Sequence, residues 1–364
     1  MMVILNVYPE MWPASGPHEN GPQEIESPAF LFGTDTNYTN ISQGIKKMSD
    51  TADFSKSKTM FGKDKNPSNI LPEKYTLDSK LRFRCHPGVS CFTQCCGNIR
   101  IILTPYDILA LRRRLDMTAA DFLHQYTVPT YLEKTDLPGV QIKLNEDDRR
   151  CPFLISATEG CRVYTDRPTT CRYYPVGMAN FHEGKQEEQN AEEFYFVVKE
   201  PHCKGFEEEK VWTIREWREN QGVDLRDRMN KAWMEIVMRR KSFGYQATLS
   251  EQAKRMFFMA STDLDQFRKF VLESSFLDTY EVDAETLDRI KQDDVELMHF
   301  AVRYLASSLF GTEDIKIKPE KIKAKVEEVK RDQERIGKTM EERAEAELAA
   351  LKAERERMRK EVGK

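Results

Sequence analysis

The 364-residue chain lacks the features that mark two common classes of protein. No window of about 18 apolar residues occurs, so the sequence predicts no membrane-spanning helix and no membrane partner. Neither sign of charge dominates, since the chain has 56 basic and 60 acidic residues. A nucleic-acid partner usually requires a basic surface. The composition therefore favours a protein that binds neither membrane nor nucleic acid.

The N-terminal segment also lacks basic residues, because Lys46 is the first Lys or Arg. A secretory signal needs a charged start, and transit peptides are poor in acidic residues, so the segment fits neither. We expect a cytoplasmic protein, in which thiols stay reduced. Residues 1–47 are rich in Pro, Gly, Asn and Glu without any period, which predicts a disordered leader. Met48 is an alternative start of translation.

Hydrophobic patterning divides the remaining chain into four segments and predicts an α+β protein. Residues 48–80 form an extended lead-in, and residues 81–206 a small, loop-rich domain with every cysteine. Residues 207–312 form a helical domain, because apolar residues recur three and four positions apart. Residues 313–364 form a long charged helix.

Local signals place several elements in the cysteine domain. GNIRIIL, residues 97–103, predicts a short strand, as do VQIKLNED and EFYFVVKE. A helix is expected after Thr104, with Pro105 in its first turn and Asp107 completing a capping box. A second helix is expected after Thr118.

The helical domain has a stripe of Met and aromatic residues, which favours a bundle core over a ligand pocket. The candidate core residues are Trp212, Trp217, Trp233, Val237, Phe257, Phe258, Phe267, Phe270, Phe300 and Tyr304.

The C-terminal tail carries 16 basic and 14 acidic residues over 313–364. This interleaved balance predicts a solvated helix with i,i+4 ion pairs. A heptad runs through Ile322, Val326, Val329, Ile336 and Met340, so a coiled coil that recruits a protein partner is the alternative.

The most unusual feature is the loop RCHPGVSCFTQCCGN, which contains half of the cysteines in the chain. The eight cysteines are Cys85, Cys91, Cys95, Cys96, Cys151, Cys161, Cys171 and Cys203. Structural disulfides are disfavoured by the expected compartment and by the length of the chain. Buried, inert thiols are the second alternative, but the loop is rich in turns and is not an apolar helix face.

Metal coordination explains the pattern best. Thiolates select zinc, copper(I) or iron–sulfur clusters, and four sulfurs can close one zinc site or hold one cluster. We therefore predict all eight cysteines as metal ligands, with an iron–sulfur cluster or zinc as cofactor. His86 and His202 flank cysteines and are weaker candidates.

Arginines surround the second half of the cysteines: Arg149, Arg150, Arg162, Arg167 and Arg172. A metal bound by four thiolates is negatively charged, so guanidinium groups beside it would offset this charge. We expect these arginines around the site.

The closely spaced cysteines ending in CC, followed by CPFL, GCRVY, DRPTTCRYYP and CKG, resemble the bacterial YkgJ-like cysteine-cluster family. The resemblance covers about Cys85 to Phe206 and implies a zinc- or iron-chelating domain. It aligns all eight cysteines with the family's cluster. Arg167, Pro168, Arg172 and Pro175 align with its RP–CR–P signature.

One branch of that family, the flagellin lysine N-methylases, implies an iron–sulfur cluster used with S-adenosylmethionine. This chain has no Gly-rich loop after a strand and no C-x3-C-x2-C triad. Our main hypothesis is therefore a metal-binding protein of unknown cellular role. The alternatives are a cluster-dependent transferase, such as a protein lysine N-methylase, and a scaffold with a structural metal domain; whether the protein is an enzyme stays open.

Overall fold

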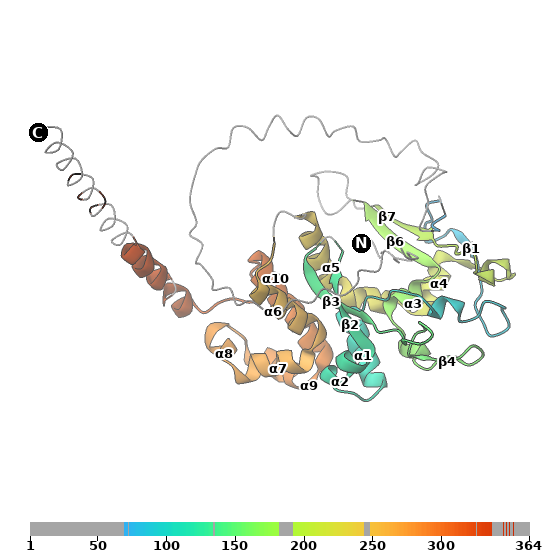
Figure 1. Ribbon diagram of the computed structural model, residues 1–364, viewed down its shortest axis with the longest axis horizontal. Coiled ribbons are helices and arrows are strands. Elements are labelled where there is room, and N and C mark those ends of the chain that lie inside the picture. The colour runs from blue at the N-terminus through green and yellow to red at the C-terminus, as the bar shows by residue number, and fades with distance from the viewer. Residues whose placement is uncertain are drawn as a thin grey trace, which may run out of the picture. The chain divides into compact units, whose positions relative to one another are not determined.

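The computed structural model of the chain describes residues 69–71, 73–133, 135–181, 192–243, 248–324 and 326–336, with residues 345, 347, 349 and 352. The expected disordered leader 1–47 and most of the expected lead-in 48–80 lie outside these residues. Contacts divide the chain into two compact units (Figure 1). We call residues up to 103 with 141–228 the cysteine unit, and residues 104–140 with those from 229 onwards the helical unit.

The mixture of helices and small antiparallel sheets confirms the α+β class. These contact-defined units do not follow the boundaries expected along the sequence, because residues 104–140 group with the C-terminal helices. The boundaries at 81–206 and 207–312 remain predictions about domains.

The cysteine unit is built from short antiparallel strand pairs. β1 (Lys80–Arg82) pairs with β8 (Val211–Thr213), β4 (Leu154–Ser156) with β5 (Gly160–Cys161), and β6 (Val176–Phe181) with β7 (Glu192–Val197). Between them lie the short helix α3 (Thr169–Tyr173) and α4 (Ile214–Gln221). A capping box between Thr213 and Glu216 begins α4, and Gly222 ends it in the left-handed conformation at φ 63°.

Aromatic residues form the core of the cysteine unit. Phe83 is fully buried, and its ring lies 5.3 Å from that of Trp217, edge to face, and 5.1 Å from that of Phe206. Trp212 packs against the same core and donates its indole N–H to the carbonyl oxygen of Phe83 at 2.8 Å. Trp212 and Trp217 thus belong to the cysteine unit and not, as expected, to the helical bundle.

The helical unit begins with the two helices that the capping signals predicted. α1 spans Pro105–Arg114 and α2 spans Ala119–Tyr126, with Thr104 and Thr118 as N-caps. The remaining elements are β2 (Thr127–Leu132), β3 (Leu137–Ile142), α5 (Val223–Ser242), α6 (Glu251–Thr262), α7 (Leu264–Glu273), α8 (Phe276–Thr279), α9 (Ala284–Gln292) and α10 (Asp294–Phe310). α5 begins in the cysteine unit and continues into the helical unit.

The strand expected at 97–103 forms only isolated bridges, between Gly97 and Arg150 and between Ile102 and Gln141. Asn98 has φ 50°, which interrupts the extended backbone between the two bridges. The strand expected in VQIKLNED lies earlier, in β3, and the one in EFYFVVKE coincides with most of β7.

The core of the helical unit centres on α10. Phe300 and Tyr304 of this helix contact Phe267 and Phe276 with ring centroids 5.3–6.3 Å apart. Most of the predicted core residues are buried here, including Trp233, which is 5% exposed. Burying such side chains contributes about 1.5–3 kcal/mol each to the free energy of unfolding.

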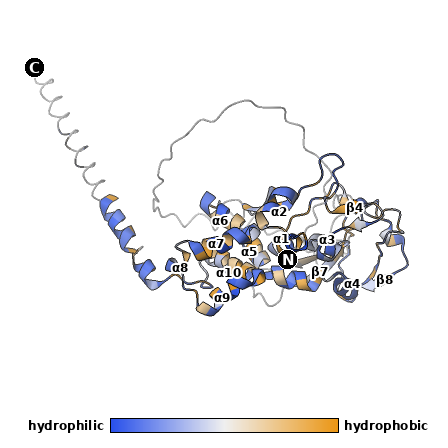
Figure 2. Ribbon diagram, turned by 90° about the horizontal axis from the view of Figure 1, so that it is seen from below, coloured by the Kyte–Doolittle hydropathy of each residue, from blue (hydrophilic) through white to orange (hydrophobic). Residues whose placement is uncertain are grey.

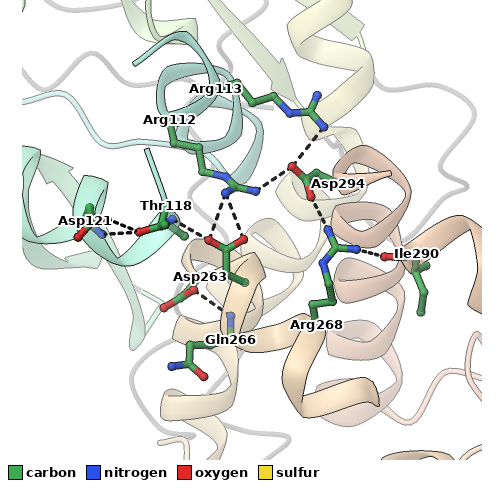
Figure 3. Close-up of polar contacts among 11 residues, drawn as sticks. Arg112, Arg113, Thr118, Asp121, Asp263, Gln266, Arg268, Ile290 and Asp294 are labelled. Carbon is green, nitrogen blue, oxygen red and sulfur yellow. Dashed lines mark hydrogen bonds and ion pairs between the residues drawn. The ribbon is translucent and has the colours of Figure 1, made fainter. Parts of the chain in front are cut away.

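A network of arginines and aspartates joins α1, α7 and α10 (Figure 3). Asp294, at the start of α10, accepts from Arg112 of α1 at 2.8 Å, from Arg113 at 3.3 Å and from Arg268 of α7. Arg112, with 9% of its side chain exposed, also contacts Asp265 at 3.1 Å. The carboxylates therefore neutralise a nearly buried guanidinium group and join helices distant in the sequence.

The charged tail is helical at every described residue from 319 to 336, and Figure 2 colours it as mainly hydrophilic. Its apolar residues Ile322, Val326, Val329 and Ile336 are 41–49% exposed. Within the described ranges, every helix is too short or too polar to cross a lipid bilayer.

Candidate metal centre

The loop of residues 85–96 consists of successive tight turns. Backbone N–H groups of Val89, Phe92, Gln94 and Cys96 each donate to the carbonyl oxygen three residues earlier, at 2.9–3.0 Å. Thr93 takes a left-handed conformation at φ 67°, which is uncommon for a residue with a branched Cβ. The tight backbone keeps four cysteines within a short loop instead of spreading them along a strand.

Backbone hydrogen bonds bring the later cysteines to this loop. The N–H of Cys151 donates to the carbonyl oxygen of Cys96 at 2.8 Å. The N–H of Lys204, next to Cys203, donates to the sulfur of Cys91 at 3.0 Å. Residues more than 50 positions apart in the sequence are therefore neighbours at the loop.

Electrostatic coupling links the thiols. Partial shielding of the thiol from water by the surrounding protein, together with the nearby charges of Cys91, Cys203 and Cys96, raises the pKa of Cys85 to about 11, although the residue as a whole is exposed. Burial raises the pKa of Cys151 to about 12, and the charges of Cys96 and Cys161 add to this shift.

Cys171 belongs to the same neighbourhood, because its charge contributes to the raised pKa of Cys95. All eight predicted ligands are free cysteines, and each is linked to at least one other by charge or by a hydrogen bond.

Backbone N–H groups are aimed at several sulfurs. Cys151, Cys161 and Cys203 each accept from the residue two positions later, namely Phe153, Val163 and Gly205. These hydrogen bonds lower the pKa of the thiols, because they favour the thiolate. Thiolate is the form that binds a metal, so this repeated arrangement suits metal coordination.

Cys95 and Cys96 form a hydrogen-bonded pair with opposite shifts. The hydrogen bond from Cys95 lowers the pKa of Cys96 to about 7, against a burial effect, and Arg150 assists. The same hydrogen bond raises the pKa of Cys95 well above its usual value. Cys96 is thus the cysteine most readily ionised near neutral pH among those with a resolved shift.

Three of the five predicted arginines act on the thiols. Arg150 lowers the pKa of Cys96, while Arg162 and Arg167 oppose the effect of burial on the pKa of Cys161. They supply the positive charge that a thiolate-bound metal requires nearby.

Arg172 has a different role. Its guanidinium group donates to the carbonyl oxygen of Gln221 at 2.7 Å and to those of Arg167 and Thr165. The residue therefore caps the C-terminal end of α4 and holds the chain around α3. Arg149 takes a left-handed conformation at φ 58°, and its carbonyl oxygen accepts from the N–H of Asn98 at 3.0 Å.

The two histidines are held by carboxylates. Nε2 of His86 lies 2.9 Å from Glu208, and its Nδ1 accepts from the N–H of Gly88 at 3.1 Å. Both ring nitrogens of His86 are therefore engaged. Nε2 of His202 lies 3.3 Å from Glu200.

Tyr174 is a site residue that the sequence analysis missed. Its hydroxyl lies within hydrogen-bonding reach of the sulfur of Cys203 and, at 3.3 Å, of a carboxylate oxygen of Glu200, and its single proton is donated to one of them at a time. Donation to the sulfur lowers the pKa of Cys203. The position of Tyr174 within CRYYP, between two motif residues, was the only signal in the sequence.

The donor set fits a thiophilic metal by its chemistry, because the soft sulfur ligands have N–H donors and arginines around them. In the described part of the chain, no group of three or more His, Cys, Asp or Glu is already arranged to hold a metal ion. Coordination would therefore require the sulfurs to move from the positions they have in this structure.

Comparison with known proteins supports the same segment. Residues 84–210 match the family model CxxCxxCC, which is described as "Putative zinc- or iron-chelating domain". The chain matches no curated protein and no solved structure. The segment of this chain that contains all eight cysteines is therefore a CxxCxxCC domain, the family of the YkgJ-like proteins.

Proposed function

We propose that this protein binds zinc or an iron–sulfur cluster through its cysteines, with all eight as ligands. The observation that carries the proposal is the set of backbone N–H groups aimed at the sulfurs of Cys91, Cys151, Cys161 and Cys203. A neutral buried thiol is a weak acceptor with little need for such a donor, whereas a thiolate on a metal is stabilised by it.

The bound metal would supply crosslinks between segments that have only short helices and strands. Thiolate ligation would tie the loop of residues 85–96 to residues 151–171, and the free energy of binding would add to that of folding. The arginines Arg150, Arg162 and Arg167 would offset the charge of the thiolates. Tyr174 would orient the sulfur of Cys203.

Replacement of a ligand in the loop tests the proposal. In Cys96→Ser we expect less bound metal per chain and a lower melting temperature, measured by elemental analysis and circular dichroism after anaerobic purification. Ser90→Ala is the matched control, because Ser90 is exposed in the same loop. Wild-type protein without zinc, iron or other metal would reject the proposal, and so would a Cys96→Ser variant with unchanged metal content and melting.

The visible absorption spectrum separates the two cofactors. An iron–sulfur centre absorbs in the visible range, while a zinc protein is colourless. The transferase alternative requires a further ligand, S-adenosylmethionine, and calorimetry of the anaerobic protein with this compound tests it. We expect the protein to be cytoplasmic, as its free thiols suit a reducing compartment.

We also infer that the tail helix docks a helical partner with acidic residues beside its apolar seam. Ile322, Val326, Val329 and Ile336 follow the a and d positions of a heptad, with Gln333 at one a position, and the four apolar side chains are exposed. So narrow a stripe is typical of a coiled-coil seam. Beside it, Lys323 and Lys330 occupy successive e positions.

A synthetic helix with Leu at its a and d positions and Glu at its e and g positions is the probe for this docking surface. We expect binding that weakens with salt and is lost in the double variant Val326→Glu, Val329→Glu, whereas Arg331→Ala, on the opposite side, binds normally. No binding to wild type, or self-association of the full chain in light scattering, would contradict this occupant.

A further inference from the structure

The backbone arranges six of the eight cysteines in two groups of three. The first group is Cys85, Cys91 and Cys203. The N–H of Arg84 donates to the carbonyl oxygen of Gly205 at 3.0 Å, so the residue before Cys85 meets the segment just after Cys203. The N–H of Lys204 donates to the sulfur of Cys91 at 3.0 Å. Two independent contacts thus join the start of the loop to residues 203–205.

The second group is Cys96, Cys151 and Cys161. The N–H of Cys151 donates to the carbonyl oxygen of Cys96 at 2.8 Å. Leu154, whose N–H donates to the carbonyl oxygen of Cys151 at 3.1 Å, pairs with Cys161 across the β4–β5 hairpin. The end of the loop is thereby joined to the hairpin and not to residues 203–205.

The electrostatic neighbours of each thiol follow the same division. The leading thiol neighbours of Cys85 are Cys91 and Cys203, with Cys96 after them, whereas those of Cys151 are Cys96 and Cys161. Cys95 is linked to both groups, because its neighbours include Cys96 and Cys85, and Cys171 is a further neighbour of Cys95. Cys95 therefore lies between the groups, and Cys171 is near Cys95.

We propose that the eight thiols form two separate metal centres, one on Cys85, Cys91 and Cys203 and the other on Cys96, Cys151 and Cys161, with Cys95 and Cys171 each completing one of them. This inference rests on the proposed metal binding and adds the number of centres and their ligands. Four thiolates close a tetrahedral site, so eight provide for two.

The charge around the thiols is consistent with two centres. Each centre with a divalent ion and four thiolates carries about two negative charges. Arg150 acts on Cys96, Arg162 on Cys151 and Cys161, and Arg167 on both Cys85 and Cys161. Arg167 thus reaches thiols of both groups, and its side chain is held by the carbonyl oxygen of Tyr164 and by Gln221.

Reconstitution of the full reduced chain with Zn²⁺ alone tests the two-centre arrangement. We expect about two zinc ions per wild-type chain, about one in Cys161→Ser, about one in Cys203→Ser and close to none in the double variant. Ser90→Ala should match the wild type. Elemental analysis gives the stoichiometry, and circular dichroism identifies any variant that has not folded.

A measurement on the wild type alone covers the case in which a variant fails to fold. After partial zinc loading and alkylation, mass spectrometry counts the unlabelled thiols on each chain. We expect about four protected thiols on chains with one zinc and about eight on chains with two.

The outcomes distinguish the two proposals. One zinc per wild-type chain with no more than about four protected thiols overturns the second centre but leaves metal binding intact. Two zinc ions that are both lost in either folded single variant indicate one bridged cluster and overturn the separation. No zinc on the wild type overturns the two zinc centres, and if the anaerobically purified protein also lacks iron, the proposed function itself is overturned.

Discussion

The two units of this chain differ in the interactions that can stabilise them. The helical unit has helices of up to 17 residues lying wholly within it and a core in which aromatic rings contact one another around α10. The cysteine unit has strand pairs of two to six residues and several segments without regular structure. Isolated two-stranded sheets are marginally stable, so this unit depends on its aromatic core, and under our proposal a metal bound by its thiols would add crosslinks.

The largest expected effect comes from metal removal and would sharpen this contrast. Chelation of the metal-loaded full chain should strongly reduce amide protection in peptides from residues 85–96 and 151–171, because structural zinc contributes on the order of 10 kcal/mol to folding in small domains. Peptides from α10 should keep their protection. Hydrogen exchange with mass spectrometry measures the protection of both sets of peptides. An equal loss of protection in the cysteine segments and in α10 would contradict this difference between the units.

Removal of an aromatic ring from the core of the helical unit should destabilise that unit and leave metal binding by the cysteine unit unchanged. Phe267 is fully buried, so Phe267→Ala should lower the free energy of unfolding by about 3–5 kcal/mol in urea denaturation. Metal content should stay unchanged. Phe243→Ala is the control, because this ring is 50% exposed and its loss should have little effect. A loss of metal in Phe267→Ala would show that the units are not independent.

The ion network of the helical unit should contribute less. Asp294→Asn removes the charge that faces Arg112, Arg113 and Arg268, leaving Arg112 nearly buried with one carboxylate fewer. We expect a loss of about 1–3 kcal/mol. Asp288→Asn should be neutral, since Asp288 is exposed and lies 3.8 Å from Lys291. Equal melting temperatures of the two variants would contradict a stabilising role of the network.

The smallest effect should depend on pH. Burial on its own raises the pKa of Asp136, but the N–H of Leu249 and the ammonium group of Lys254 outweigh it and hold the pKa below its usual value. The carboxylate therefore stabilises the folded state above the unfolded pKa, near 4, and this contribution disappears as the pH falls through the lower folded pKa. Asp136→Asn should lower the melting temperature by about 1–2 °C at pH 7 and not at pH 2. If the melting temperature of Asp136→Asn is still lower than that of the wild type at pH 2, the charge of Asp136 is not the cause of the difference.

Local signals in the sequence were sufficient for several elements. Thr104 with Asp107, and Thr118, begin helices as predicted, because a capping side chain satisfies backbone N–H groups within the same few residues. The expected strand at 97–103 failed, since its partners are single residues distant in the chain and Asn98 turns the backbone. Strand pairing depends on partners that a local pattern does not contain.

For the candidate site, residue types could be predicted but individual roles could not. Arg150, Arg167 and Arg172 look alike in the sequence. In the structure the first two act on thiols, while Arg172 binds the carbonyl oxygen that ends α4. Tyr174 was missed because its contact with Cys203 spans 29 positions of the chain.

By itself, the sequence determined the inventory: eight cysteines, the family to which their segment belongs, the capped helices and the charged tail. These depend on residue identity and on neighbours within a few positions. The tertiary structure alone decided that Cys151 lies beside Cys96 and that Cys91 lies beside Lys204. Such contacts arise from hydrogen bonds between segments that folding brings together, and no spacing along the chain encodes them.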